Sequence, residues 1–549
     1  MEQRATRPTI AALGASTLCG AFQVTAAERP QQVALRTLGG ATEITYAEYA
    51  ARVRALAAGL HSLGVGRGDT VALMLANRPE FALADAAAMH LGATPFSVYN
   101  TSSAEQVNYL FRSAGNRIVV TERQFLPRVL EARTTEVEHV VLVDGDERGT
   151  ITLDDLARLQ APGFDFDSAW RAVEPDDVVT LIYTSGTTGP PKAAQLTHAS
   201  ALFQTRAVAQ VLPVAPGGRG ISYLPSAHVG DRCLSHYGGS LCFGATVTSI
   251  ADHRQVGLAL AEVRPTMFGG VPRVWEKLKA GLQAAGVGDP SRLPEPLRAA
   301  VRARIGLDQA DWLVTAAAPA SMEVMQYFQA LGLTLNEGWG MSELSCFGTL
   351  NPPDDVRMGT VGKALPGVEL RIAEDGELLV RAPLVMKGYR GDPERTAEAL
   401  DTDGWLHTGD IAQIDGDGYV RIVDRKKEII INSAGKNMSP ANIELKLRGS
   451  SPYIAHAVCI GDRRPYNVAL IALDRELCAG RTPEDLRTAI EAAVARANGE
   501  LSRVEQVRRF AIVDGDWLPG GDELTPTMKL KRKPILQKYA AEIEQLYSG

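Results

Sequence analysis

A glycine- and hydroxyl-rich decapeptide, YTSGTTGPPK at residues 183–192, directly follows the apolar run VVTLI. Its glycines allow backbone N–H groups to approach a ligand closely, and its hydroxyls and lysine add donors and positive charge that suit a polyphosphate. The residues that could bind phosphate in this way are Thr184, Ser185, Gly186, Thr187, Thr188, Gly189 and Lys192. The Walker A pattern GxxxxGK[ST] is absent. A solvated surface turn is the alternative, since its composition is typical of loops, but the buried strand before it counts against that interpretation.

The segments that would position these residues alternate between short β-branched runs and helix-length amphipathic stretches. The predicted strands include TVALML, RIVVT, HVVLV, DVVTLIY, ISYLP and WLVTA. Strands separated by helices predict parallel sheets covered by helices, with ligands bound at the carboxyl ends of the strands. After about residue 345 the pattern changes to GELLVRAP and DGYVRIV, which is typical of β-hairpins. The charged cluster DRKKEII, beginning at residue 424, marks a candidate boundary before a smaller αβ segment.

The composition describes a protein of two or more domains, because 549 residues with 45% hydrophobic content exceed what one core normally holds. Every apolar stretch is interrupted before about 18 residues, so we expect no membrane-spanning helix and only peripheral membrane contact, if any. The net charge of −7 argues against nucleic-acid binding, which needs a basic face. Six widely spaced cysteines without a CxxC pair predict reduced thiols and a cytoplasmic protein. The chain's apolar start is interpreted as a first helix and strand rather than a signal peptide.

Five motifs occur in an order that resembles the signature blocks of the adenylate-forming superfamily. They are YTSGTTGPPK at 183, GWGMSE at 338, WLHTGD at 405, DRKKEII at 424 and TPTMKLKR at 525. The superfamily contains acyl-CoA synthetases, peptide-synthetase adenylation domains and firefly-type luciferases. The segments SYLPSAHVGDR and PTMFGGVPRVWEKL are most similar to its long-chain fatty acyl-CoA synthetases. The joint order of the motifs favours the phosphate-binding interpretation of residues 183–192 over the surface turn.

The resemblance implies an α/β fold in two unequal domains. Residues 1–423 are expected to form an N-terminal adenylation core domain, with parallel-sheet αβ subdomains and a small β-barrel-like subdomain. Residues 424–427 are the expected hinge, with Lys427 at the pivot. Residues 428–549 are expected to form a smaller, mobile C-terminal α+β domain.

The resemblance also assigns roles around ATP, Mg²⁺ and CoA. It places Thr184 and Glu343 at the metal, the hydroxyl loop and Lys192 around the phosphates, and Trp339 against the adenine. Asp410 would accept hydrogen bonds from the ribose hydroxyls, and Arg425 would donate to the same region. The other expected nucleotide-binding residues are Ala317, Gly340, Met341 and Ser342. Considered singly, a tryptophan is usually a core residue and an aspartate a turn residue, so the assignments depend on the order of the motifs.

Lys529 matches the lysine that contacts the carboxylate and the α-phosphate during adenylation in this family. Considered alone, KLKRK at 529–533 would be a basic surface tail. Met528 replaces the glycine that commonly precedes that lysine, which leaves Lys531 open as the alternative. The expected catalytic residues are Lys529, Glu343, Thr184 and His228.

The second half-reaction of the family is attack by the CoA thiol on the acyl-adenylate after the small domain has rotated. Gly435 would then line the pantetheine tunnel. His228 lies in the block that gates the carboxylate pocket. The expected acyl-pocket residues are His228, Gly238, Gly239 and Gly270. The same glycines could instead allow close helix packing.

The favoured function is therefore ATP-dependent conversion of a carboxylic acid, a long-chain fatty acid, to acyl-AMP with release of pyrophosphate, and then to acyl-CoA. One alternative is an adenylating enzyme that loads an acyl carrier protein. Another is a catalytically silent acyl- or nucleotide-binding protein, which the retention of Glu343, Asp410 and a lysine in the last block disfavours. The sequence indicates no oligomeric state.

Overall fold

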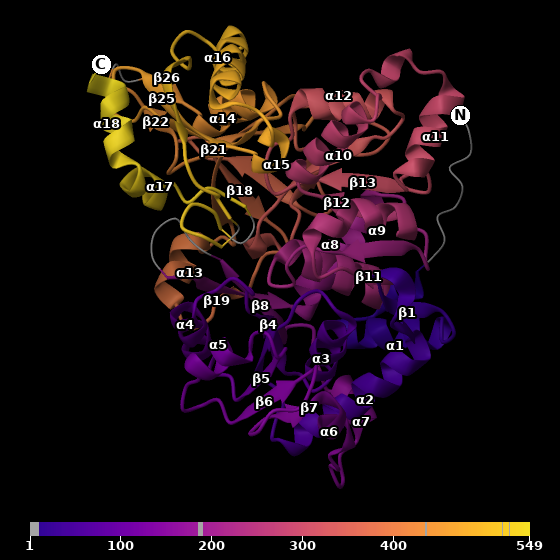
Figure 1. Cartoon of the computed structure of the whole chain (residues 1–549). Coiled ribbons are helices and arrows are strands. Elements are labelled where there is room, and N and C mark those ends of the chain that lie inside the picture. The colour runs from indigo at the N-terminus through magenta and orange to yellow at the C-terminus, as the bar shows by residue number, and fades with distance from the viewer. Residues whose placement is uncertain (1–9, 185–189, 434–435, 519, 526–527, 549) are drawn as a thin grey trace.

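The structure, a computed structural model, describes residues 10–184, 190–433, 436–518, 520–525 and 528–548. A large N-terminal part, indigo to orange, lies against a smaller C-terminal part that ends in yellow at the top of Figure 1. The chain therefore folds as two unequal bodies with a long contact between them.

The largest sheet has eight strands in the order β19-β9-β8-β4-β3-β5-β6-β7. Six of them, from β8 to β7, pair in parallel, while β9 and β19 are antiparallel additions at one edge. The strands are β3 (Thr70–Met74), β4 (Thr94–Ser97), β5 (Ile118–Thr121), β6 (His139–Leu142), β7 (Ile151–Thr152), β8 (Val178–Thr184), β9 (Lys192–Thr197) and β19 (Gly388–Tyr389). All residues of β3, β4 and β5 are buried, which explains the continuous apolar runs VALM in β3 and IVV in β5.

Hydroxyl residues begin several of the helices that cover this sheet. Thr45, Ser103 and Thr197 each accept a hydrogen bond from the backbone N–H three residues later and so cap α2, α4 and α8. The helices of this part are α1 (Leu18–Glu28), α2 (Tyr46–Ser62), α3 (Pro79–Met89), α4 (Ala104–Ala114), α5 (Leu126–Glu131), α6 (Leu153–Arg158), α7 (Phe166–Arg171) and α8 (His198–Val211).

A second sheet of five strands has the order β12-β13-β14-β15-β16, and its first three strands run in parallel. It contains β12 (Met267–Gly270), β13 (Trp312–Thr315), β14 (Leu335–Trp339), β15 (Thr349–Leu350) and β16 (Lys363–Ala364). Its helices are α9 (Val256–Val263), α10 (Pro272–Ala284), α11 (Glu295–Arg304) and α12 (Met322–Ala330). The carboxyl ends of its parallel strands point toward the C-terminal part, where a ligand crevice is expected.

Two four-stranded sheets complete the N-terminal part. One has the order β10-β11-β1-β2 and consists of β1 (Val33–Thr37), β2 (Glu43–Thr45), β10 (Arg219–Ser222) and β11 (Thr246–Ser249). The other, in the region of the expected hairpins, is fully antiparallel with the order β17-β18-β20-β21. Its strands are β17 (Glu369–Ile372), β18 (Glu377–Arg381), β20 (Leu406–Ile414) and β21 (Val420–Arg425), and α13 (Pro393–Ala399) lies beside β20 in sequence.

The C-terminal part packs helices on a three-stranded sheet in the order β24-β25-β26. It contains β22 (Ile430–Ile431), β23 (Asn437–Met438), β24 (Ile454–Ile460), β25 (Asn467–Leu473) and β26 (Val507–Val513). Its helices are α14 (Pro440–Gly449), α15 (Arg475–Cys478), α16 (Pro483–Gly499), α17 (Arg532–Lys538) and α18 (Ala540–Ser548). This part is the smaller α+β body that the sequence predicts.

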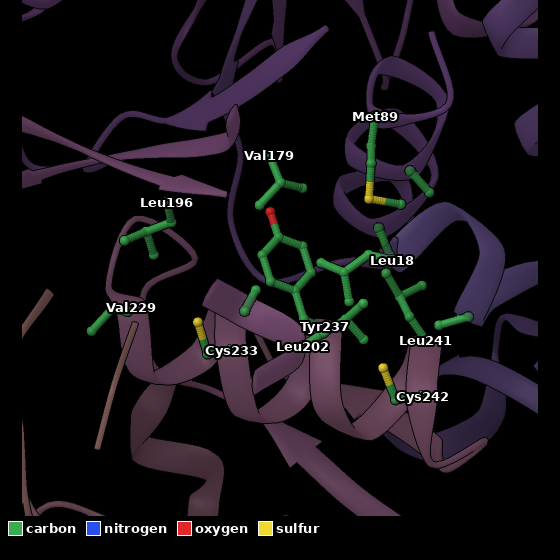
Figure 2. Close-up of a cluster of buried hydrophobic side chains, with 14 of the residues drawn as sticks. Leu18, Met89, Val179, Leu196, Leu202, Val229, Cys233, Tyr237, Leu241 and Cys242 are labelled. Carbon is green, nitrogen blue, oxygen red and sulfur yellow. The ribbon is translucent and has the colours of Figure 1, made fainter. Parts of the chain in front are cut away.

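A buried helix with π-type hydrogen bonding, η3 (Asp231–Cys242), lies at the centre of the N-terminal part. Figure 2 shows Cys233, Tyr237 and Leu241 of η3 among side chains from other elements, including Leu18 of α1 and Leu202 of α8. Because η3 joins several layers in one hydrophobic core, its register determines which of its side chains face the cavity described below.

The predicted parallel strands of the N-terminal half and the change to antiparallel strands are both confirmed. Within the described ranges, no helix is long and apolar enough to cross a membrane. All six cysteines are free.

Candidate functional site

A cavity of about 2340 Å³ lies between the two parts of the chain. The carboxyl ends of β8, β12, β13 and β14 contribute to its N-terminal wall, and residues 525–532 contribute from the opposite side, except for 526–527, which are not described. Of the expected site residues described, all but Gly238 line this cavity: Thr184, Lys192, His228, Gly239, Gly270, Ala317, Trp339, Gly340, Met341, Ser342, Glu343, Asp410, Arg425, Lys427 and Lys529. Ser185, Gly186, Thr187, Thr188, Gly189 and Gly435 lie outside the described residues.

Three expected nucleotide-binding residues form one connected group. Trp339 Nε1 donates a 2.8 Å hydrogen bond to Asp410 Oδ2, and Arg425 Nε lies 2.7 Å from Asp410 Oδ1. Asp410 and Arg425 are opposite each other in the β20–β21 pair, so strand register holds the ion pair. Burial raises the pKa of Asp410, and the Arg425 charge opposes that rise. Each carboxylate oxygen keeps a second lone pair, so Asp410 can still accept hydrogen bonds from a ligand.

Glu343 is held by a residue that the sequence analysis did not select. Tyr389 OH donates a 2.8 Å hydrogen bond to Glu343 Oε1, and Lys192 Nζ lies 4.7 Å from the centroid of the Tyr389 ring. Burial and the Glu343 charge together raise the pKa of Tyr389, which keeps its hydroxyl protonated. Tyr389 stands in the segment LVMKGYRG, within the region after residue 345 for which the sequence predicts only β-hairpins, and no motif indicates its contact with Glu343.

The two ends of the glycine-rich loop face each other, because Thr184 ends β8 and Lys192 begins β9 in the register Thr184↔Lys192. The Lys192 ammonium, the Thr184 hydroxyl and the Glu343 carboxylate therefore share one cavity. Mg²⁺ in phosphoryl chemistry usually has one or two carboxylates, with waters and phosphate oxygens completing its coordination. A single carboxylate beside a hydroxyl fits that pattern.

Two further residues, on β13 and β14, that the sequence analysis missed could bind a nucleotide. Glu337 and Thr315 are paired across β14 and β13, both line the cavity, and Glu337 Oε2 and Thr315 Oγ1 have no hydrogen-bond partner. Burial raises the pKa of Glu337 to about 7. Unpaired buried polar atoms at a cavity wall fit a ligand that carries its own donors and acceptors, as a nucleotide does.

Lys529 extends into the cavity from the C-terminal part. It keeps solvent access there, yet the surrounding protein and the Arg425 charge lower its pKa, while Asp410, Glu343 and Glu428 act in the opposite direction. The preceding Met528 has φ of 63°, in the left-handed region that favours glycine. The departure from glycine noted in the sequence therefore falls at a strained position.

Lys531, the alternative lysine, has a different environment. Its Nζ donates a 2.8 Å hydrogen bond to the carbonyl oxygen of Gly521, and its backbone N–H donates to Glu523 O at 2.7 Å. Although Lys531 also lines the cavity, its ammonium is bound to the C-terminal part itself. The geometry therefore favours Lys529 as the lysine available to a ligand.

His228 lies on the N-terminal side of the cavity. Surrounding protein and the Lys529 charge lower its pKa to about 4, so the ring is neutral near pH 7. Its Nδ1 accepts a 3.1 Å hydrogen bond from Gly230 N–H, which assigns the ring proton to Nε2. His228 can therefore donate a hydrogen bond but cannot supply a positive charge.

The expected acyl-pocket glycines divide between two cavities. Gly239 and Gly270 line the main cavity, while Gly238 lines a separate cavity of about 10 Å³. A Cβ on Gly238 or Gly239 would come within 2.9 or 3.0 Å of a carbonyl oxygen of η3, and a Cβ on Gly270 would lie 2.8 Å from Trp275 Nε1. Close packing is thus one reason for glycine at all three positions, while their role in an acyl pocket stays a prediction.

Helix α10 forms a charged contact between the two parts that the sequence analysis did not identify. Arg273 pairs with Asp474, Lys277 Nζ lies 3.1 Å from Glu476 Oε2, and Glu276 Oε1 lies 3.9 Å from Arg448 Nη1. Figure 1 shows α10 beside α15 and α14 of the C-terminal part. These pairs stabilise the arrangement in which Lys529 faces the cavity.

Comparisons with known proteins cover both parts of the chain. Residues 22–390 match the family described as AMP-binding enzyme, and residues 427–549 match the AMP-binding enzyme C-terminal domain. Long-chain-fatty-acid–CoA ligase FadD15 of Mycobacterium tuberculosis is 35% identical over 565 residues, which cover 92% of each chain. Another M. tuberculosis protein, fadD11, whose name assigns it provisionally to the fatty-acid–CoA ligases, is 47% identical over 452 residues, covering 73% of this chain and 79% of its own.

Solved structures agree on the fold. The adenylation domain of a carboxylate reductase from Mycobacterium chelonae matches with a TM-score of 0.82 at 21% identity, covering 99% of this chain and 94% of that one. The anthranilate CoA ligase AuaEII in complex with anthranoyl-AMP matches with a TM-score of 0.79 at 21% identity, covering 96% and 98%.

Proposed function

Because this chain belongs to the AMP-binding enzyme family, we propose that it is a fatty-acid–CoA ligase that uses ATP to convert a long-chain carboxylic acid to its CoA thioester. The family match confirms the predicted adenylate-forming resemblance, and the fold matches the predicted class. The observation that carries the proposal is the position of Lys529, which extends from the C-terminal part into the cavity that Glu343, Asp410 and His228 line from the other side.

The first step brings two anions together, a carboxylate and the α-phosphate of ATP. Lys529 and Lys192 supply positive charge against their repulsion, and His228 Nε2–H donates a hydrogen bond to the carboxylate. Asp410, held by Trp339 and Arg425, accepts hydrogen bonds from the ribose. The nucleotide and the acid are thereby oriented for in-line displacement of pyrophosphate.

Thr184 and Glu343 would hold Mg²⁺, which when bound neutralises phosphate charge. The hydrogen bond from Tyr389 fixes one Glu343 oxygen at the cavity wall, so the carboxylate is oriented before any ligand arrives. A preorganised group of this kind needs little rearrangement during the reaction.

The second step requires the C-terminal part to rotate about Lys427 so that the CoA thiol can reach the acyl-adenylate. Lys427 is exposed and follows the end of β21 by two residues. Rotation would break the α10 ion pairs and carry Lys529 out of the cavity. Of these three pairs, Lys277–Glu476 is exposed and contributes little, whereas Arg273 and Asp474 are largely buried and their separation costs more.

The experiment measures acid-dependent pyrophosphate release and thioester formation over fatty acids of graded length, with CoA, with an acyl carrier protein and with neither. We expect CoA-dependent thioester and AMP from long-chain acids. Glu343→Ala should reduce pyrophosphate release by about 10²-fold or more, the scale for loss of a preorganised electrostatic group. Glu484→Ala, an exposed residue of α16, is the matched control and should have no effect. Thioester formation only with the carrier protein, or from none of the acids, would contradict the proposal.

A further inference from the structure

The small cavity of about 10 Å³ lies between α8 and η3, behind the main cavity. Gln204 and Thr205 of α8, Leu234 and Gly238 of η3, and Trp312 of β13 are among its lining residues. Figure 2 shows Leu202 of α8 and Cys233 of η3, which also lines the small cavity, in the same packed cluster of buried side chains. Most of its wall is apolar.

Gln204 is the exception in this wall. Its side chain is 1% exposed, and neither Oε1 nor Nε2 has a hydrogen-bond partner. An amide buried with both groups unpaired costs folding free energy that an apolar side chain of similar size would not cost. By contrast, Thr205 Oγ1 is already satisfied by the carbonyl oxygen of Ala201 at 2.9 Å. The unpaired amide therefore requires an explanation, and a ligand with its own polar group supplies one.

The position of the small cavity relative to the reaction site follows from strand register. The main cavity is lined along both β12 and β13, from Gly270 and Thr315 at the nucleotide end to Met267 and Trp312, which are paired at the other end. Three residues of strand span about 10 Å. Trp312 also lines the small cavity, so Gln204 lies beyond the deep end of the space that leads away from the nucleotide.

Among the residues that the structure describes, only Leu234 and Trp312 line both cavities. Leu234 Cδ1 lies 3.7 Å from the position that a Cβ on Gly269 would occupy, so it extends from η3 toward β12 across the boundary. A leucine side chain has alternative staggered rotamers, and the absence of a Cβ at Gly269 leaves space beside Leu234 Cδ1. A change of the Leu234 rotamer would join the two cavities.

We propose that Gln204 is a specificity-determining residue that hydrogen-bonds a hydroxyl group on the distal part of the acyl chain. The amide oxygen would accept the hydroxyl proton and the amide N–H₂ would donate to the hydroxyl oxygen, which satisfies both unpaired groups. The substrate class is then a hydroxylated long-chain acid. This inference rests on the proposed acid-activating function and adds the identity of the chain.

The small cavity has the volume of about one water molecule, which is the competing occupant. A hydroxyl group has that size, whereas a bulkier polar group would need a larger displacement of Leu234. A site built to hydrogen-bond a hydroxyl discriminates strongly against the analogue that lacks it, because the buried amide is then left unpaired. Substrate preference therefore separates the hydroxyl from a resident water.

The test measures kcat/KM of acyl-CoA formation for unsubstituted fatty acids and for equal-length acids with one hydroxyl at successive distal positions. The wild type should prefer one positional isomer over the unsubstituted acid by about tenfold or more, the size of one net hydrogen bond. Gln204→Leu should abolish that preference and keep turnover of the unsubstituted acid. Thr205→Val, which changes the same cavity without touching an unpaired group, should retain the preference.

Failure of the inference is distinguishable from failure of the proposed function. If the wild type activates unsubstituted acids and prefers them over every hydroxylated isomer, or if Gln204→Leu keeps the hydroxyl preference, the role of Gln204 is refuted while the ligase function stands. If no acid gives a CoA thioester, the proposed function fails and the inference with it. Gln204→Met is the second variant if Gln204→Leu does not fold, and its preference is judged by the same ratio.

Discussion

Replacing Lys529 and Lys531 separately by alanine tests how the site provides its positive charge. The negative charges of Asp410, Glu343 and Glu428 favour the protonated form of Lys529. The same place is where the two anionic reactants would meet. Lys531 donates its ammonium to the carbonyl oxygen of Gly521 within the C-terminal part. Although the two lysines are only two positions apart, we expect them to have different effects.

The magnitudes follow from these environments. Lys529→Ala removes one preorganised electrostatic contact to the reacting phosphate and should slow adenylation by about 10²–10³-fold. Thioester formation from supplied acyl-adenylate should change little, because the C-terminal part, once rotated as proposed, would no longer present Lys529 to the cavity. Lys531→Ala removes one partly buried hydrogen bond, about 1 kcal/mol of stability, and leaves both half-reactions within a fewfold of the wild type.

The assay is single-turnover kinetics of each half-reaction, with thermal unfolding as the control for folding. A reversed pattern, in which Lys531→Ala is the sensitive variant, would show that the register of the last motif is shifted and that the structural assignment is wrong. Equal loss of both half-reactions in Lys529→Ala would show that the residue has no role specific to adenylation.

The same lysine predicts a pH dependence. The environment lowers the pKa of Lys529, so its charge is complete at low pH and is lost as pH rises through a value below the ordinary 10.5. Adenylation should therefore fall on the alkaline side earlier than for an unperturbed lysine. The arginine in Lys529→Arg keeps its charge above pH 12, so this variant should lose the alkaline decline of the adenylation rate, even if the rate itself is lower. An unchanged alkaline decline in the variant would show that another group causes it.

Three further predictions concern the loop, the core and the interface. Met528→Gly should keep adenylation, whereas Met528→Val should depress it severalfold, because a β-branched residue resists the φ of 63° that orients Lys529; equal rates would contradict this. Burial lowers the pKa of His198 to about 3, and the neutral ring accepts a hydrogen bond at Nδ1 from Leu18 N–H. The stability that the neutral ring contributes to the fold is therefore complete above about pH 6.5 and is lost as pH falls toward 3. His198→Asn should weaken that acid dependence in denaturant unfolding between pH 7 and 4, and an unchanged slope would exclude His198. Arg273→Gln should slow adenylation several-fold and spare thioester formation in the half-reaction assays, since Arg273 pairs with Asp474 only when the two parts are docked; loss of both steps would indicate misfolding.

Much of the fold could be predicted because the signals for it are local. Residues 179–183 of β8 are buried and mostly apolar, and Thr197 caps the helix that follows the next strand, so both elements can be inferred from neighbouring residues. The antiparallel sheet after residue 345 was likewise indicated by closely spaced turn residues. The order of the eight strands in the main sheet could not be predicted in this way, because β19 pairs with β9 although the two lie nearly 200 positions apart in the sequence.

For this protein, the sequence by itself determined the motifs and therefore the family, the nucleotide chemistry and the two candidate lysines, since the chemistry of each motif is carried by residue types at fixed spacing. Tertiary structure decided which groups meet. It brought Tyr389 to Glu343, bound Lys531 to Gly521 while leaving Lys529 in the cavity, and buried the amide of Gln204 without a partner. These contacts join residues on different elements or depend on the direction of a side chain. Neither can be inferred from the neighbouring residues in the sequence. Burial and partner geometry determine the charge state and availability of a group, and both arise only when the chain has packed.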